Sequence, residues 1–241
     1  MKTLSKVIVV IPAFNEESNI AGVVENLKKH CSECDYIIVN DNSTDKTLQI
    51  CKEKNLNYIN LPNNLGIGGC VQTGYLYAFQ HDYDIAIQLD GDGQHDPSYI
   101  GEMIRLIDSG ETEIVIGSRF LDREGFQSTG LRRFGIAFLS MLIFFITGIK
   151  INDVTSGYRA VNRRFIGLFA RHYVQDYPEP EAIMDAAFNK AKITEIPVLM
   201  HKRTGGKSSI NTIKAFYYMI KVSVAIILHG LISSKTQEVK A

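Results

Sequence analysis

The chain has 241 residues, 45% of them hydrophobic, and contains no internal repeat or low-complexity tract. This composition is typical of one large α/β domain, with or without an appendage, and it excludes a repeat protein. The formal charge is zero, but residues 1–120 carry 17 acidic and 9 basic side chains, whereas residues 121–241 carry 9 acidic and 17 basic. The basic second half favours an anionic partner, either phosphate groups or an anionic membrane surface, although solvated helix faces would give the same count.

Two of the four cysteines form a C-x-x-C pattern at residues 31–34. The pattern stands at the expected end of a helix, so we interpret it as structural or incidental rather than as a redox motif. The first residues lead directly into a strand pattern, and we expect no signal peptide. Together these features predict reduced thiols and a location on the cytosolic side of a membrane.

Short apolar runs rich in β-branched residues alternate with helical patterns through the first half of the chain. They predict strands at residues 6–11, 36–39, 56–61, 85–89 and 113–117. Ser18 or Asn19 can cap the first helix, Pro97 can open the helix after the fourth strand, and residues 63–69 are expected to form a loop. This alternation predicts an α/β fold with a mostly parallel sheet and helices on both faces.

The fourth predicted strand runs directly into the sequence Asp90-Gly91-Asp92-Gly93-Gln94. Two carboxylates one residue apart at a strand end can both reach one divalent cation, and the glycines allow a ligand to come close. Hard oxygen ligands suit Mg²⁺ or Mn²⁺, which keep positions open for phosphate oxygens. An ordinary Asp-Gly turn is the alternative. A calcium-binding loop is excluded, because the two residues after Gly93 are not the ligand and the glycine that it needs.

Polar segments follow four of the predicted strands. These segments are residues 12–16, residues 40–41, residues 90–94 and Arg119. In open parallel sheets the ligand lies beyond the carboxyl ends of the strands. The sequence therefore predicts that these segments share one metal–diphosphate site at that edge of the sheet.

The second half contains two strongly apolar segments, at residues 136–149 and 216–232. Both fall short of the roughly 20 residues that a spanning helix needs. They can be core helices, or helices that lie in a membrane interface with basic and aromatic anchors, and we favour the interface. We expect one domain over residues 1–210, with an apolar interfacial segment at about 131–150, followed by a membrane-interface helix and tail over residues 211–241.

Five motifs occur in one order along the chain. They are I-P-A-F-N-E at 11–16, V-N-D-N-S-T-D at 39–45, D-G-D-G-Q-H at 90–95, G-S-R-F at 117–120 and D-V-T-S-G-Y-R at 153–159. The ordered set resembles the family 2 inverting glycosyltransferases of the GT-A fold, which is Rossmann-like. Within this family the chain looks most like the polyprenyl-phosphate glycosyltransferases, of which dolichol-phosphate mannosyltransferase is the best-known type. The resemblance covers roughly residues 6–210.

The resemblance implies which residues bind a nucleotide sugar. They are Pro12, Phe14, Glu16, Val39, Asp41, Asp90, Gly91, Asp92, Arg119, Arg203 and Lys207. It also implies that Mg²⁺ or Mn²⁺ is held by Asp90, Asp92 and Gln94. Two positions depart from the family. Phe14 stands where a tyrosine is usual, and Ser209 stands where the C-terminal motif has a lysine, which here is Lys207.

The resemblance further implies that an acceptor attacks the sugar from the face opposite the diphosphate. A lipid monophosphate has a second pKa of about 6, so it is ionised near neutral pH and needs positioning by arginines rather than a strong base. Arg119 and Arg133 are the candidates, with Arg132 less favoured. A sugar hydroxyl, as in cell-wall or surface polysaccharide synthesis, would instead need a base such as Glu181 or Glu179, unless residues 177–181 are only a surface turn.

The catalytic candidates are therefore Asp92, Arg119, Arg133 and Glu181, and Asp153 either supports the site or acts as a structural cap. We favour a uridine diphosphate sugar (glucose or N-acetylglucosamine) as donor, with guanosine diphosphate mannose left open. The expected partners are a polyprenyl phosphate and the cytoplasmic face of a membrane, where the protein would be peripheral or monotopic. A homo-oligomer or a small membrane partner stays open. A non-catalytic sugar-nucleotide-binding subunit is disfavoured because Asp90 and Asp92 are both intact, and no motif indicates nucleic-acid binding.

Overall fold

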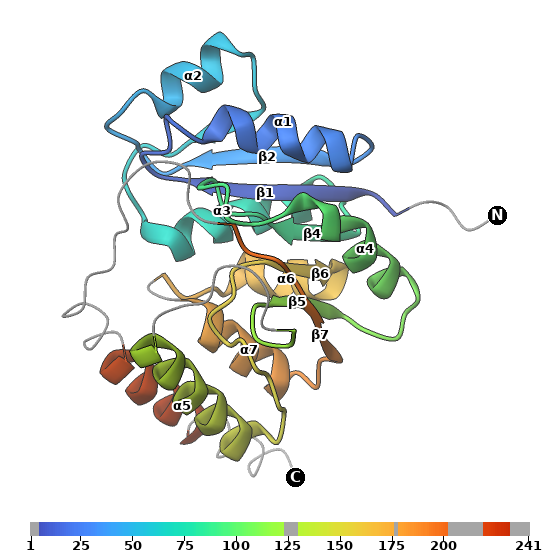
Figure 1. Cartoon of the computed structure of the whole chain (residues 1–241), viewed down its shortest axis with the longest axis vertical. Coiled ribbons are helices and arrows are strands. Elements are labelled where there is room, and N and C mark those ends of the chain that lie inside the picture. The colour runs from blue at the N-terminus through green and yellow to red at the C-terminus, as the bar shows by residue number, and fades with distance from the viewer. Residues whose placement is uncertain (1–4, 123–129, 176–177, 202–218, 232–241) are drawn as a thin grey trace.

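The computed structural model describes residues 5–122, 130–175, 178–201 and 219–231. Within these ranges seven strands form one sheet with the order β3-β2-β1-β4-β6-β5-β7 (Figure 1). The strands are β1 (Val7–Ala13), β2 (Asp35–Asn40), β3 (Tyr58–Asn60), β4 (Ile85–Gln88), β5 (Ile114–Ser118), β6 (Arg159–Asn162) and β7 (Ile193–Pro197). Strand β6 is antiparallel to β4 and β5, and the other pairs are parallel. The predicted mostly parallel sheet is confirmed.

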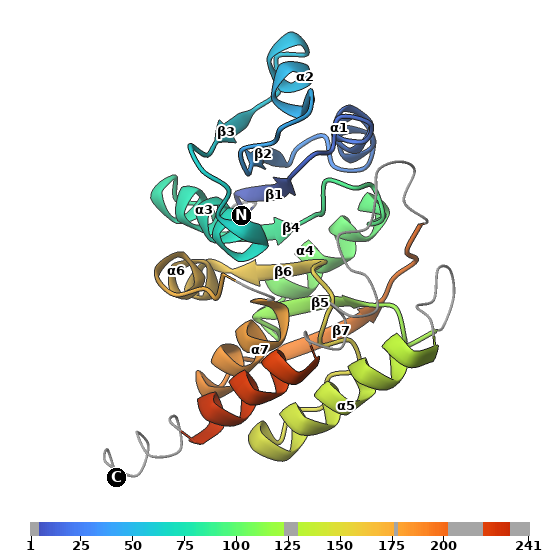
Figure 2. The same cartoon turned by 90° about the vertical axis from the view of Figure 1, so that its left-hand side faces the viewer.

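Helices cover both faces of this sheet, as Figure 2 shows for α1 and α4 on one side and α3 and α6 on the other. The helices are α1 (Ile20–His30), α2 (Thr47–Glu53), α3 (Gly66–Gln80), α4 (Ile100–Asp108), α5 (Gly130–Thr147), α6 (Arg163–Arg171) and α7 (Pro178–Phe188), with a 3-10 turn at Pro97–Tyr99. Residues 219–231 are also helical. Pro97 opens the 3-10 turn before α4, as expected.

The central strand β1 is buried along its whole length, which explains its uniformly apolar, β-branched sequence. Side chains alternate between the two faces of a strand. Ile8 and Val10 accordingly join the core under α3 and α6, whereas Val9 and Ile11 join the core under α1 and α4. Each face of the sheet therefore has its own core, and the predicted helices on both faces are confirmed.

The expected loop at residues 63–69 is wrong in its second half, because α3 begins at Gly66. The glycines there serve close packing. A Cβ at Gly68 would lie 1.9 Å from the carbonyl oxygen of Val174, and one at Gly74 would lie 2.1 Å from the Val10 side chain. The Gly68 N–H also donates to the carbonyl of Gln175 at 2.9 Å. A glycine-rich segment that is usually read as a loop is here the part of a helix that touches neighbouring backbone.

The prediction of reduced thiols is wrong for the C-x-x-C pattern, because Cys31 and Cys34 form a disulfide. Helix α1 ends at His30, and the turn that follows places the two Cα atoms 5.4 Å apart. This separation lies within the usual range for a disulfide. Cys51 and Cys70 are buried free thiols.

Helix α5 and the helix at residues 219–231 run side by side in the same direction (Figures 1 and 2). Glycines allow the close approach at both ends: a Cβ at Gly135 would lie 2.8 Å from the Met219 sulfur, and one at Gly230 would lie 2.7 Å from Ile146. Val222 is buried on the inner side of this pair. Among the described residues, no helix has both the length and the apolar character needed to cross a bilayer.

Candidate active site

The carboxyl ends of β1, β2 and β4 are joined by backbone hydrogen bonds. The Asp41 N–H donates to the Ala13 carbonyl at 2.9 Å, and the Gly91 N–H donates to the Pro12 carbonyl at 3.2 Å. A Cβ on Gly91 would lie 2.9 Å from that same Pro12 oxygen, so only glycine fits here without a shift of the backbone. Three of the predicted site segments therefore meet at one edge of the sheet.

Asp41 is a buried carboxylate that faces the start of α3. Its Oδ1 accepts a 2.7 Å hydrogen bond from the Leu65 N–H. Burial raises the pKa of Asp41, while hydrogen bonds from the Leu65 and Gly66 backbone act in the opposite direction. Val39 is buried in the strand just before it. Asp41 is thus fixed in direction, as a group that recognises one polar part of a ligand must be.

The segment after β1 presents one exposed and one buried predicted residue. Phe14 is 44% exposed, whereas Glu16 is buried and its Oε2 accepts a 2.7 Å hydrogen bond from Asn19 Nδ2. Asn15 adopts a positive φ of 57°, and its Oδ1 accepts from the Thr44 N–H at 2.8 Å. Asn19 precedes α1, but its side chain makes no capping hydrogen bond and serves Glu16 instead.

The loop after β4 carries the two carboxylates that the sequence assigns to a cation. The Asp90 side chain is 35% exposed, and its Oδ1 accepts from Gln88 Nε2 at 3.2 Å. Asp92 Oδ1 accepts from the Gln94 N–H at 3.0 Å. The Gln94 side-chain amide donates to the His201 carbonyl at 3.2 Å, which ties the loop to the segment after β7.

This donor set fits a hard divalent cation. The described residues contain no group of three or more His, Cys, Asp or Glu side chains arranged to hold a metal. A cation at Asp90 and Asp92 would complete its shell with water and phosphate oxygens, as Mg²⁺ usually does. Gly157 leaves room for this arrangement, because a Cβ there would lie 3.3 Å from both oxygens of Asp90.

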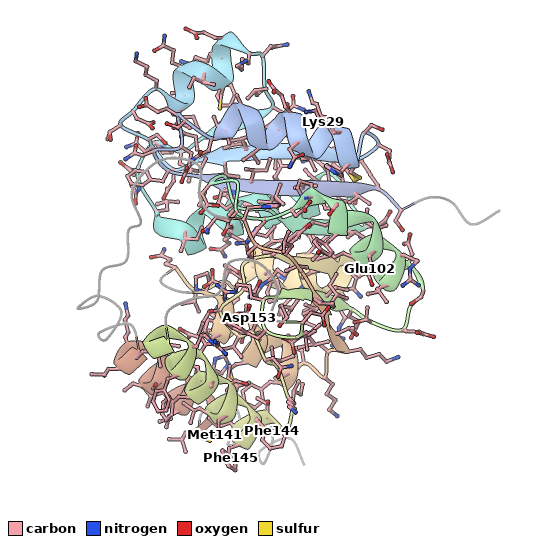
Figure 3. All side chains as sticks on the ribbon, in the orientation of Figure 1. Lys29, Glu102, Met141, Phe144, Phe145 and Asp153 are labelled. Carbon is pink, nitrogen blue, oxygen red and sulfur yellow. A yellow bond between two sulfur atoms is a disulfide. The ribbon has the colours of Figure 1, made fainter. Side chains whose placement is uncertain are left out.

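Arg119, directly after β5, is held by a buried carboxylate. Its Nε and Nη2 donate to the two oxygens of Asp153 at 2.7 and 2.6 Å, and Nη2 also donates to Thr155 at 2.8 Å. Burial alone would lower the pKa of Arg119, but the hydrogen bonds and charge of Asp153 outweigh it and raise that pKa. Asp153, labelled in Figure 3, is fully buried, and among the described residues its carboxylate accepts hydrogen bonds from Arg119 and Thr155, so it fixes the Arg119 guanidinium.

Helix α7 separates the two glutamates that were candidate bases. Burial raises the pKa of Glu179. The positive charges of Arg159 and Arg119 act to lower this pKa, and the negative charge of Asp90 acts to raise it. Burial also raises the pKa of Glu181, but the charges that act on it come from His229, Asp185, His172 and Lys221. Since α7 begins at Pro178, a surface turn is the wrong interpretation. Residues two apart on a helix point in different directions, and the charges of Asp90 and Arg119 are among those that act on Glu179.

Four basic residues named from the sequence remain. Arg133 is exposed near the start of α5. Arg203 and Lys207 lie outside the described residues, as does the side chain of Arg132.

Sequence reasoning missed four residues that line Asp90 or Glu179, namely Gln88, His95, Gly157 and Arg159. Arg159 is buried, and its guanidinium donates to the Ser156 carbonyl at 2.7 Å. Two of the four stand inside the D-V-T-S-G-Y-R motif, and that motif was the available signal. Its contacts with β4 could not be read, because β6 was not predicted.

An α/β sheet with carboxylates beyond a central strand is typical of proteins that bind a ligand at the carboxyl ends of parallel strands, and comparison with known proteins identifies the family. The glycosyl transferase family 2 model matches residues 8–168, so the chain belongs to glycosyl transferase family 2 and is a glycosyltransferase. It is 31% identical to the UDP-N-acetylglucosamine–dolichyl-phosphate N-acetylglucosaminyltransferase of Methanococcus voltae, over 91% of this chain and 96% of that one. It is 29% identical to the dolichyl-phosphate beta-glucosyltransferase of Saccharomyces cerevisiae, over 91% and 75%. Its relatives thus place it in the polyprenyl-phosphate subgroup.

Solved structures agree on the fold. The glucosyl-3-phosphoglycerate synthase of Mycobacterium tuberculosis, determined in complex with Mn²⁺, uridine diphosphate and glucosyl-3-phosphoglycerate, superposes with a TM-score of 0.70. The match covers 94% of this chain and 80% of that one at 18% sequence identity. The expected GT-A fold is confirmed.

Proposed function

We propose that the protein transfers a sugar from a nucleotide diphosphate sugar to a polyprenyl phosphate at the cytoplasmic face of a membrane, with inversion. The observation that carries this proposal is the meeting of buried Asp41 and the Asp90–Asp92 loop at one sheet edge. The name of the Methanococcus voltae relative supports UDP-N-acetylglucosamine as donor, and the name of the yeast relative supports transfer of glucose. The name of a mycobacterial relative at 22% identity, polyprenol monophosphomannose synthase, keeps a mannosyl donor as the competing outcome.

In this proposal Asp90, Asp92 and Gln94 would hold Mg²⁺ or Mn²⁺, and the chemistry that such a cation would supply there is neutralisation of the negative charge on the leaving diphosphate. Asp41 and the backbone after β1 hold the nucleotide. Arg119, fixed by Asp153, supplies a positive charge whose position does not depend on the ligand. A preorganised cation stabilises developing negative charge without a reorganisation cost.

Helix α5 and the helix at residues 219–231, together called the α5 pair, have an apolar surface that supports a lipid acceptor. Large apolar side chains on α5 and on residues 219–231 are exposed: Phe134, Phe138, Met141, Phe144, Phe145, Ile220, Val224, Ile227, Leu228 and Leu231. Figure 3 shows Met141, Phe144 and Phe145 together at one end of the molecule. Contiguous exposed apolar surface marks an interaction site. Helices of this kind can lie in a membrane interface, with the exposed Arg133 near the lipid phosphates.

A donor-to-lipid transfer assay tests this function. The purified protein, Mn²⁺ or Mg²⁺, one radiolabelled nucleotide sugar at a time and a polyprenyl phosphate are incubated, and counts in the organic phase are followed. We expect label with one donor, and its loss in Asp92→Ala. Glu102→Ala, which removes an exposed carboxylate on α4, is the matched control and should retain activity. Binding or hydrolysis of a nucleotide sugar without lipid labelling would overturn the phosphate acceptor.

The second candidate is transfer to a sugar hydroxyl, and the position of Glu179 beside the charges of Asp90 and Arg119 favours it. A hydroxyl acceptor needs a base, whose removal typically costs 10²- to 10⁴-fold in rate. A phosphate acceptor does not. We therefore compare Glu179→Gln with Glu181→Gln in the lipid assay: a fall of less than about tenfold in both supports the phosphate acceptor. The same variants are compared with a saccharide acceptor in place of the lipid, where a loss of transfer confined to Glu179→Gln supports the hydroxyl acceptor.

A further inference from the structure

His95 is a buried polar residue to which the roles described above assign nothing. It is 5% exposed and follows the Asp90–Gln94 loop directly. An antiparallel bridge to Met200 fixes its backbone. Buried polar side chains in folded proteins have hydrogen-bond partners, and the partner identifies what the side chain does.

Both ring nitrogens of His95 face one and the same residue. The Asp90 N–H donates to Nδ1 at 3.1 Å, and Nε2 faces Oδ2 of the Asp90 carboxylate at 3.6 Å. A nitrogen that accepts a hydrogen bond carries no proton, so the hydrogen-bond pattern assigns the ring proton to Nε2. The imidazole thus presents an acceptor to the main chain of Asp90 and a donor to its carboxylate.

The ring has no freedom to turn away. It stacks on Tyr158 with a centroid distance of 4.8 Å and an interplanar angle of 11°. The Tyr158 hydroxyl in turn donates to the Asp96 carbonyl at 2.8 Å, one residue beyond the histidine. Tyr158 belongs to the D-V-T-S-G-Y-R motif, so this motif and the D-G-D-G-Q-H motif lock each other in place.

Two further groups lie against the Asp90 carboxylate. Gln88 donates to Oδ1 at 3.2 Å, and the missing side chain of Gly157 lets the backbone of that residue pack against both oxygens. With His95 at Oδ2, these neighbours determine the direction in which the carboxylate points. A group that orients a metal-binding carboxylate without touching the metal typically changes metal affinity or activity 10- to 100-fold when it is removed.

We propose that His95 is a positioning residue for Asp90, which aims its carboxylate at the divalent cation and keeps it there in the absence of substrate. This inference rests on the proposed metal-binding role of Asp90. It assigns His95 no contact with the cation or with the substrate.

The test is a titration of each protein with Mn²⁺, without nucleotide sugar, followed by electron paramagnetic resonance of the free ion. His95→Phe keeps a flat ring on Tyr158 but loses both nitrogens, and we expect a 10- to 100-fold weaker Mn²⁺ affinity and a similar loss in kcat/KM. His95→Asn places an oxygen near the position of Nδ1 and should recover part of the affinity. His81→Phe is the matched control, because His81 also stacks on a tyrosine, at the far end of α3, and should bind Mn²⁺ as the wild type does.

Wild-type Mn²⁺ affinity in a folded His95→Phe protein overturns the inference, provided that Asp90→Asn loses binding. Unchanged binding in Asp90→Asn also overturns it, but by removing the metal-binding proposal on which it rests. Circular dichroism establishes folding first. If His95→Phe does not fold, the Mn²⁺ affinities of His95→Asn and His95→Gln test the inference instead. Each of these variants keeps one of the two contacts that the His95 ring nitrogens make with Asp90. Weakened binding in either supports the positioning role, and wild-type affinity in both overturns it.

Discussion

At the scale of single residues, the site depends on close contacts that leave no room for substitution. The loop after β4 approaches the Pro12 carbonyl, and Gly157 approaches Asp90. The charge of Arg119 is positioned by the buried carboxylate of Asp153. Each of these contacts joins two segments that are distant in the sequence. A single substitution at such a contact can therefore shift one segment relative to the other and disturb the geometry of the whole site.

Gly91→Ala is expected to destabilise the fold by about 1–3 kcal/mol, because the new Cβ would meet the Pro12 carbonyl oxygen at 2.9 Å. The KM for the nucleotide sugar should rise as the loop shifts. Gly101→Ala on α4 is the control: a Cβ there meets nothing within 4 Å, so alanine should stabilise the helix by about 0.5–1 kcal/mol. Urea unfolding measures both, and equal stabilities would contradict the prediction.

Asp153→Asn is expected to cost about 3–5 kcal/mol, because it removes the charge of the buried carboxylate that accepts two hydrogen bonds from the poorly exposed Arg119 guanidinium. Asp82→Asn is the matched control, since Asp82 forms an ion pair of the same 2.6 Å length with Arg163 on the surface. Exposed pairs are typically worth under about 1 kcal/mol. Chemical unfolding at neutral pH compares the two variants, and similar losses would show that Asp153 is not a strong partner.

At the scale of elements, the helix at residues 219–231 is attached to the domain by packing and by an ion pair with α7. His229 Nε2 lies 3.1 Å from Asp185 of α7, and its ring stacks on Phe188. The hydrogen bond with Asp185 raises the pKa of His229, burial opposes this, and the charges of Asp185 and Glu181 add to it. His172 and Lys221 are the other charged groups that act on this cluster.

His229→Gln should therefore lose stability in a pH-dependent way. A histidine with a raised folded-state pKa contributes stability that is fully present below its unfolded pKa, about 6.5, and is lost as the pH rises through the folded pKa. The difference in unfolding free energy between the wild type and His229→Gln should be largest at about pH 5.5–6 and shrink toward pH 9. Urea unfolding at each pH measures it. In an Asp185→Asn background the pH dependence should disappear, and its persistence there would rule out the pair as its source.

At the scale of the whole molecule, the exposed apolar residues are concentrated on the α5 pair, away from α1 and α2 (Figures 1 and 3). The basic half of the chain contains both of these helices. A surface that combines apolar side chains with nearby basic groups binds anionic lipid more strongly than neutral lipid.

Phe145→Glu should weaken binding to vesicles of anionic and zwitterionic lipid in a flotation assay. Phe145 is 75% exposed, so the substitution should change the free energy of unfolding by less than about 0.5 kcal/mol. Leu76→Glu is the matched control, because it places the same charge at an exposed apolar position on α3. Equal flotation of the two variants would exclude the α5 pair as the membrane-binding surface.

Much of the first half of the molecule could be predicted from local patterns. Strands β1, β2, β4 and β5 are continuous apolar runs, and their burial produces that pattern directly. Strand β6 is four residues long and antiparallel, and only its insertion between β4 and β5 defines it. Such pairing depends on distant partners that a local pattern does not contain.

The sequence by itself determined the sheet edge and the carboxylates that stand there, because strand ends and motif order are local properties. Only the tertiary structure decided which residues support them. It paired Arg119 with Asp153, aimed His95 at Asp90, and separated Glu179 from Glu181 by the turn of one helix. It also joined Cys31 to Cys34. These outcomes depend on distances and directions between side chains, which are set by packing across the fold.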